Sequence, residues 1–127
     1  MEFNMTKQGF VTQTEYDELH ISPDEEYGFR PYQLMVASIV GCSASVLRKV
    51  LTKMRMDFSD INISAQVERN EEEASRIERI RLHFVIVGKN LRKEKVERAL
   101  ALSRKNCAMV QSVEGRMEVE ETFELEG

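Results

Sequence analysis

Two cysteines, Cys42 and Cys107, are the residues of this 127-residue sequence with the clearest capacity for chemistry. Cys42 lies among small residues in the segment Gly41-Cys42-Ser43-Ala44, where a neighbouring helix or a substrate can approach the thiol closely. In a reducing cytosol an ordinary structural disulfide is disfavoured, which leaves two interpretations. The thiols are either small buried apolar side chains or a pair that performs redox chemistry.

A redox pair would consist of an attacking and a resolving cysteine. The attacking thiolate cleaves a peroxide O–O bond and becomes a sulfenic acid, which the second thiol converts to a disulfide that a cellular dithiol reduces. Because apolar surroundings raise a thiol pKa, Cys42 needs a nearby positive group, and we expect it to lie too far from the start of its helix for the helix dipole to help. Arg30 is the nearest upstream cation, whereas Arg48 falls on a different side of the helix. We therefore expect Arg30 to stabilise the thiolate.

Other candidate ligands are few. His20 and His83 are the only imidazoles, and His83 falls on the polar face of its predicted strand, which favours a surface role. A structural zinc site needs four ligands in tetrahedral geometry, and neither cysteine has a histidine or a second cysteine at metal-ligand spacing. We expect no metal and no cofactor.

A long helix is the element that must position Cys42. Residues 1–21 are typical of short strands joined by turns, and residues 22–30, with one proline, one glycine and three acids, are typical of a loop. Pro31 suits the first turn of a helix. From Leu34 to Leu47 apolar residues occupy nearly every face, which predicts a central helix buried on all sides and amphipathic only beyond Leu47.

The second half of the sequence predicts a β-hairpin, a helix and a final strand. Residues 61–68 and 79–86 alternate apolar and polar side chains around an acidic turn. A last strand runs from Met117 to Leu125, with Glu121 breaking its apolar face. In the intervening helix one apolar face is predicted to include Cys107; its members are Val96, Ala99, Leu100, Ser103 and Cys107.

These elements predict an α+β fold with a mainly antiparallel sheet, a long central helix and a second helix. The length suits one domain, residues 1–127. A helix that is apolar on all sides needs more cover than one small sheet and one amphipathic helix provide. We therefore expect an obligate homodimer.

Charge and hydropathy exclude several classes of partner. The formal net charge is −4, whereas a nucleic-acid-binding domain normally has a basic face, so we expect no nucleic acid. The uncharged apolar stretch Pro31 to Leu47 is shorter than the ~20 residues of a membrane span, so we expect no membrane. No cationic segment followed by an apolar one occurs at the N-terminus, which predicts a cytoplasmic protein.

The segment from Arg30-Pro31 to Val40-Gly41-Cys42-Ser43-Ala44 resembles the helix of the OsmC/Ohr family, in which a proline begins a Leu/Ala-rich helix leading to a Gly- or Ala-flanked cysteine. Cys107, near the end of the later helix, is similar to the family's second cysteine, and the element order also fits. The resemblance implies an intertwined homodimer with its active sites at the subunit interface. It further implies a thiol peroxidase that reduces organic hydroperoxides and protects against oxidative stress.

By this resemblance Cys42 is the peroxidatic and Cys107 the resolving cysteine, and the reductant is a dithiol or a lipoyl protein. The family usually has a glutamate just after the proline, paired with an arginine from the N-terminal strands. Here Tyr32 and Gln33 occupy those positions and no arginine precedes Arg30. The charge pair is therefore missing, or rebuilt from Arg30 with Glu25 or Glu26, which is typical of a divergent OsmC-like branch.

Two alternatives to the peroxidase remain at this point. A non-catalytic OsmC-like dimer could bind an apolar small molecule in its interface with both thiols structural, and the missing charge pair favours this interpretation. A thiol redox sensor would share the first oxidation step but would not turn over with a dithiol.

Overall fold

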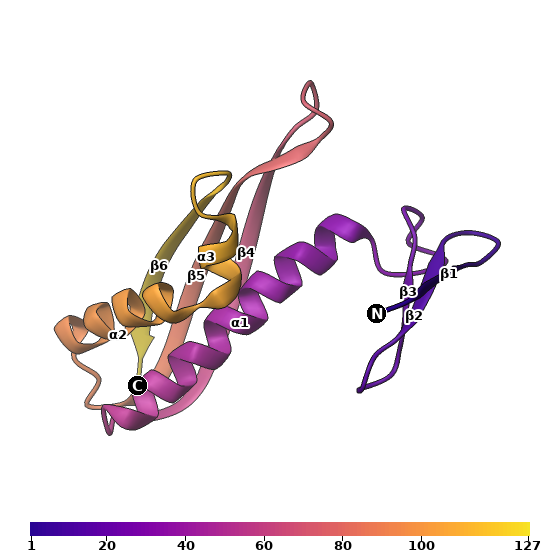
Figure 1. Ribbon diagram of the computed structural model, residues 1–127. Coiled ribbons are helices and arrows are strands. Elements are labelled where there is room, and N and C mark those ends of the chain that lie inside the picture. Colours follow the sequence, from indigo (N-terminus) through magenta and orange to yellow (C-terminus); the bar gives the residue numbers. More distant parts are fainter. The chain divides into compact units, whose positions relative to one another are not determined.

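The computed structural model describes residues 1–127, which form two compact units, Met1–Ala37 and Ser38–Gly127. The first unit contains three short antiparallel strands in the order β1-β2-β3 (Figure 1). They span Phe3–Met5 (β1), Phe10–Gln13 (β2) and Glu18–Ile21 (β3). The prediction of short strands joined by turns over residues 1–21 is confirmed.

The first unit buries almost no apolar side chain of its own. Its buried residues, Thr12 and Ser22, are polar and hydrogen-bonded to backbone carbonyls. Its large apolar side chains are exposed: Met5 is 80% and Phe29 is 59% exposed. A sheet of this size is not stable without an apolar face packed against something, so this unit requires cover.

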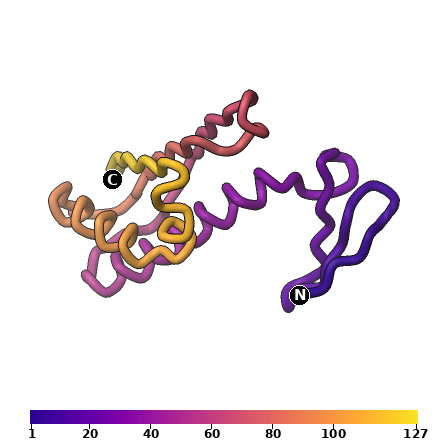
Figure 2. Tube along the Cα trace, turned by 45° about the horizontal axis from the view of Figure 1, so that its top comes forward, coloured from indigo at the N-terminus to yellow at the C-terminus, as the bar shows by residue number.

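The second unit is a sheet with helices packed on one face (Figure 1). Helix α1, Pro31–Lys53, begins in the first unit and continues into the second. Figure 2 follows the chain from α1 through the long hairpin and back through two further helices to the last strand. The remaining elements are β4 (Asp57–Asn70), β5 (Arg76–Lys89), α2 (Lys93–Asn106), α3 (Ala108–Val113) and β6 (Glu118–Glu126).

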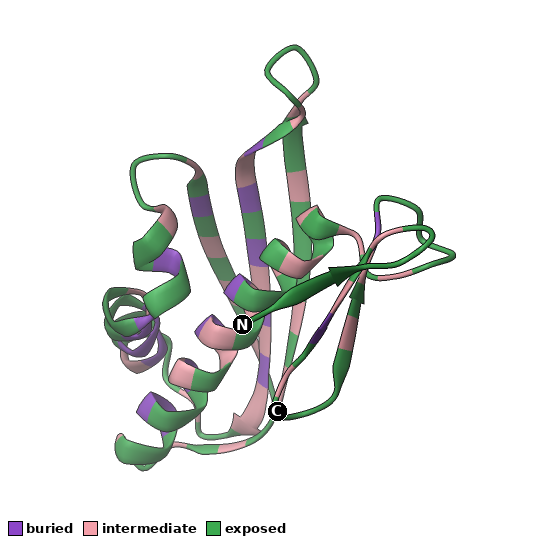
Figure 3. Cartoon of the chain, turned by 45° about the vertical axis from the view of Figure 1, so that its right-hand side comes forward, coloured by how far each residue is buried: buried purple, intermediate pink, exposed green.

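Strand β5 is the centre of this sheet and of the core. It pairs antiparallel with β4 and parallel with β6, since helices α2 and α3 form the crossover connection that a parallel pair needs. Alternate β5 residues are buried against the helices, and Figure 3 shows these buried bands along the strand. They are Ile80, Leu82, Phe84 and Ile86, while Arg79, Arg81 and His83 lie on the opposite face. The α+β fold with a mainly antiparallel sheet is confirmed.

The prediction that α1 is buried on all faces is wrong for the single chain. One face is buried, through Ile39, Ser43, Leu47, Val50 and Leu51, while Met35 is 44% exposed. Although the uncharged stretch Pro31 to Leu47 is shorter than a membrane span, the whole helix of 23 residues is long and apolar enough to cross a membrane by length and composition. One such helix is weak evidence for a membrane span, because the core helix of a globular fold meets the same criterion.

The periodicity predicted that Cys107 lies on one face of a helix, and this prediction is wrong. Helix α2 ends at Asn106, and Cys107 has extended backbone (φ −85°, ψ 108°) before α3 begins at Ala108. The helix ends here because the Arg104 carbonyl accepts the Cys107 N–H at 3.4 Å and the Gln111 side-chain amide at 3.0 Å. The cysteine therefore occupies a junction between two helices.

Candidate functional site

The two cysteines, far apart in the sequence, are hydrogen-bonded neighbours in the second unit. Cys42 is half-buried on α1, and Cys107 is fully buried at the α2–α3 junction. Both are free thiols. The contact joins α1 to the point where α2 ends and α3 begins.

The surroundings of Cys42 favour its thiolate. The Met109 backbone N–H, which donates a hydrogen bond to the Cys42 sulfur, is the largest cause of a pKa below the ordinary value for cysteine. The Cys107 thiol and the Ala108 N–H donate further hydrogen bonds that lower the same pKa, and partial burial opposes them. Hydrogen bonds to the charged form of a group stabilise that form.

Cys107 has the opposite tendency. Burial is the largest cause of a raised pKa for its thiol, and the Val110 N–H opposes it. The hydrogen bond to Cys42 and the charge of Cys42 raise the same pKa further, and the Met109 N–H lowers it slightly. Cys42 is therefore the more acidic thiol of the pair and the one that ionises first. This is the arrangement that an attacking and a resolving thiol require, because only the thiolate is nucleophilic.

The backbone donors at Ala108 and Met109 were missed by the sequence analysis. They are the first N–H groups of α3, which have no partner within their own helix. Cys42 is remote from the start of α1, as expected, but a different helix supplies the donors. No side-chain pattern signals such a contact; only the break between α2 and α3 at Cys107 could have indicated it.

Arg30 lies in the first unit, within a small cluster of its own. Its Nη2 is 3.2 Å from the Tyr32 hydroxyl and 3.9 Å from Glu25, and its guanidinium lies over the Tyr32 ring at 5.1 Å. Its Nε is buried without a hydrogen-bond partner. Glu25 is thus the acidic residue that meets Arg30, although its side chain is 78% exposed and the contact is long.

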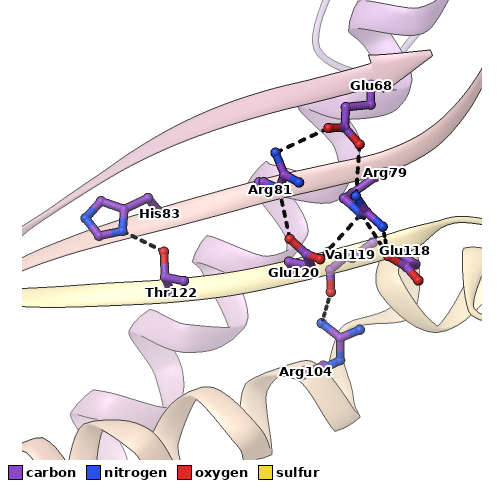
Figure 4. Close-up of polar contacts among 9 residues, drawn as sticks. All are labelled: Glu68, Arg79, Arg81, His83, Arg104, Glu118, Val119, Glu120 and Thr122. Atoms are coloured by element: carbon purple, nitrogen blue, oxygen red, sulfur yellow. Dashed lines mark hydrogen bonds and ion pairs between the residues drawn. The ribbon is translucent and has the colours of Figure 1, made fainter.

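The polar face of the β4–β5–β6 sheet holds a network of paired charges (Figure 4). Arg79 contacts Glu68 at 3.1 Å, Glu118 at 2.7 Å and Glu120 at 3.4 Å, and Arg81 contacts Glu68 and Glu120. These carboxylates form the solvent face of a sheet, as the alternation indicated. Exposed pairs of this kind contribute little stability each.

The two histidines make polar contacts with other residues of their own units. His83 contacts the Thr122 hydroxyl at 2.7 Å on the polar face of the sheet (Figure 4). It also contacts Glu124 at 3.2 Å. His20, 3.6 Å from Glu18, is in the first unit. The structure holds no group of three or more His, Cys, Asp or Glu side chains arranged to bind a metal ion.

Comparison with known proteins places the chain in a family. Residues 23–122 match the family described as OsmC-like protein. Protein YhfA of Escherichia coli (strain K12) is 30% identical over 96 residues, which cover 75% of this chain and 72% of YhfA. A crystal structure of a hypothetical protein from Aquifex aeolicus VF5 superposes with a TM-score of 0.87 at 25% identity, covering 98% of this chain and 93% of that one.

An organic hydroperoxide resistance protein from Elizabethkingia anophelis shares the fold, with a TM-score of 0.76 at 16% identity over 98% of this chain and 96% of that one. The family match includes the loop before α1, both cysteines and most of β6. Sequence, element order and three-dimensional arrangement thus agree. This chain belongs to the OsmC-like protein family.

Proposed function

We propose that this protein is a thiol-dependent peroxidase that reduces organic hydroperoxides with Cys42 and Cys107 and protects against oxidative stress. The observation that carries the proposal is the hydrogen-bonded thiol pair, in which the Cys42 pKa is lowered and the Cys107 pKa is raised. Structures of organic hydroperoxide resistance proteins from Elizabethkingia anophelis, Legionella pneumophila and Bacillus subtilis have the same fold, which supports the choice of substrate class.

The first step oxidises Cys42. Its thiolate sulfur attacks the terminal oxygen of the hydroperoxide, a sulfur–oxygen bond forms and the O–O bond breaks. The departing alkoxide takes a proton and leaves as an alcohol, so the peroxide is reduced and Cys42 becomes a sulfenic acid. The N–H groups of Met109 and Ala108 lower the pKa of the Cys42 thiol and so favour the thiolate that attacks.

The second step closes a disulfide. The Cys107 sulfur attacks the Cys42 sulfur, the sulfur–sulfur bond forms and the sulfur–oxygen bond breaks. The hydroxide leaves as water with the proton that Cys107 gives up. A dithiol, free or carried by a lipoyl protein, then reduces the disulfide by exchange and restores both thiols. Because that cycle needs a reducing pool, we propose the cytoplasm as its location.

We further propose that the working unit is a homodimer. Two surfaces of the single chain need cover: the half-exposed faces of α1 and the apolar side chains of the N-terminal unit. A second copy offers matching apolar surfaces. Each Å² of apolar surface that the two copies bury contributes about 25 cal/mol to their association. We expect Arg30 to stabilise a Cys42 thiolate in the dimer, with the Nε that has no hydrogen-bond partner in the single chain.

A thiol titration tests the proposal. Reduced protein is mixed with one equivalent of cumene hydroperoxide per subunit, and free thiols are counted. We expect two thiols to be lost per subunit, with recovery on addition of dihydrolipoamide. Cys42→Ser should block all loss, and Cys107→Ser should stop at a sulfenic acid that dimedone traps. Unchanged thiols in the wild-type protein would overturn the peroxidase proposal.

A non-catalytic dimer that binds an apolar small molecule is the second candidate. Tyr32 and Gln33, in place of the family's glutamate, are the observation that favours it. In that case Cys42→Ala should leave ligand binding intact, and the thiols should react slowly with small alkylating agents. A redox sensor would show the first oxidation step without turnover by a dithiol.

A further inference from the structure

Glu121 is a carboxylate in a position where the fold calls for an apolar residue. It lies on the helix-covered face of β6, between Val119 and Phe123, and pairs in register with the buried Leu82. Its side chain is only 9% exposed. Burial of a carboxylate costs free energy unless partners compensate, so its contacts are informative.

Two contacts join Glu121 to the helices. The Ser43 hydroxyl, 1% exposed on α1, donates to Oε2 at 3.4 Å. The Arg104 guanidinium, on α2, places Nη1 3.8 Å from Oε1. The same Nη1 donates to the Val119 carbonyl at 2.6 Å, which fixes the guanidinium against β6 (Figure 4).

Each of these partners is linked through the backbone to one of the two cysteines. Ser43 follows Cys42 on α1, so its hydrogen bond to Glu121 joins the turn that carries the attacking sulfur to β6. Arg104 accepts the Cys107 N–H with its own carbonyl, at the point where α2 ends. Glu121 therefore connects the two backbone segments that carry the thiols, from one rigid strand.

The contacts do not offset the burial of the charge in full. Burial raises the pKa of Glu121, although Arg104 and Ser43 act to lower it. A leucine or valine in this position would suit the core better, since replacing a buried ionic contact with well-packed apolar residues is often neutral or stabilising. A buried charge with this arrangement points to a role other than stability.

We infer that Glu121 is a positioning residue for the thiol pair: through Ser43 and Arg104 it holds Cys107 opposite Cys42 for closure of the disulfide. The inference rests on the proposed function only for the identity of the oxidant. Closure itself requires the Cys107 sulfur to meet the Cys42 sulfur along the axis of the bond that breaks. Misplacement by about 1 Å can slow such a step about a hundredfold.

Glu121→Gln is the first test. It keeps the size and the acceptor for Ser43 but removes the charge that faces Arg104. We expect the ratio of the disulfide-closing rate to the sulfenic-acid-forming rate to fall about tenfold, a fraction of the effect of a full misplacement. Both rates are followed after a pulse of cumene hydroperoxide, by dimedone trapping and by loss of the second thiol. Glu124→Gln, on the opposite face of the same strand, is the matched control and should leave the ratio unchanged.

A second variant guards against an indirect effect. Ser43→Ala removes the α1 contact alone and should lower the same ratio. The double variant should lower it by less than the product of the two single effects, because both act through the side chain at position 121. Equal ratios in the wild-type protein, Glu121→Gln and Ser43→Ala would overturn the inference.

Diamide separates this inference from the proposed function. It accepts two electrons and two protons from a dithiol, giving a disulfide and a hydrazine, without any peroxide. Slower diamide-driven closure in Glu121→Gln than in Glu124→Gln supports the positioning role, even if the wild-type protein does not react with cumene hydroperoxide. Equal diamide rates in both variants overturn it, even if the protein is a peroxidase.

Discussion

The Cys107 thiol donates a hydrogen bond to the Cys42 sulfur, and the two residues shift in acidity in opposite directions. This hydrogen bond makes Cys42 easier to ionise than Cys107. Cys42, which is half-buried, is the more acidic of the two thiols, and Cys107, which is buried in the core, is the less acidic. The asymmetry needs no side-chain cation within the second unit, because backbone donors supply the positive end of the contact.

Removal of the Cys107 thiol should make Cys42 less acidic. Cys107→Ala takes away one of the donors that lower the Cys42 pKa, so that pKa should rise, while the Met109 N–H keeps it from rising as far as loss of all donors would. The measurement is the pH dependence of alkylation by iodoacetamide, followed by mass spectrometry of the Cys42 peptide. A midpoint that stays constant or moves to lower pH would contradict the assignment.

Removal of a backbone donor should have the same sign. Ala108→Pro deletes one N–H that lowers the Cys42 pKa. Proline is tolerated at the first position of a helix, and the extended backbone of Cys107 suits a residue that precedes proline. The fold should therefore survive while alkylation of Cys42 requires higher pH. Ala108→Gly retains the N–H and serves as the control, with an unchanged midpoint.

The elements around these thiols differ in how far the sequence pattern predicts them. Hydropathy alternation located β4, β5 and β6, because their faces are set by the two-residue period and the partner strands share it. Helical periodicity predicted that the second helix continues through Cys107, although the helix ends at Asn106. The break depends on hydrogen bonds to the Arg104 carbonyl, which no periodicity encodes.

The chemical site divides in the same way. Residue type and small neighbours identified Cys42, and helical spacing put Cys107 on an inward-facing position. The donors at Ala108 and Met109 are main-chain groups, so residue type carries no signal for them. Glu121 was visible only as an interruption of an apolar face, because its partners Ser43 and Arg104 come from segments that are distant in sequence.

The core should depend on β5 and very little on the first unit. Phe84 is fully buried and Tyr16 is 97% exposed. Phe84→Ala should lower the free energy of unfolding by about 3–5 kcal/mol, through lost burial and the cavity it leaves. Tyr16→Ala should change it by far less. Urea unfolding followed by circular dichroism distinguishes the two, and similar losses would contradict the assignment of the core.

The oligomeric state can be tested without a variant. Light scattering across a dilution series should give a dimer at low micromolar concentration, because α1 and the N-terminal unit leave apolar side chains uncovered in one chain. The melting temperature should then fall with dilution, as it does for any protein stabilised by association. A well-folded monomer at these concentrations would rule out the obligate dimer.

Glu121→Gln should separate stability from function. Burial raises the pKa of Glu121 above its ordinary value of 4.5, so the folded protein binds the proton more tightly than the unfolded chain does. The stability that this tighter proton binding contributes is fully present below the unfolded pKa of Glu121, and it is lost as the pH rises through the folded pKa. At neutral pH the buried carboxylate therefore costs stability, which a neutral glutamine does not. We expect Glu121→Gln to unfold at higher urea concentration than the wild-type protein at pH 7, and the two to converge as the pH falls below 4.5. A variant that is more stable yet closes its disulfide more slowly shows that the carboxylate serves the thiols, whereas a variant that is both less stable and slower assigns it to the core alone.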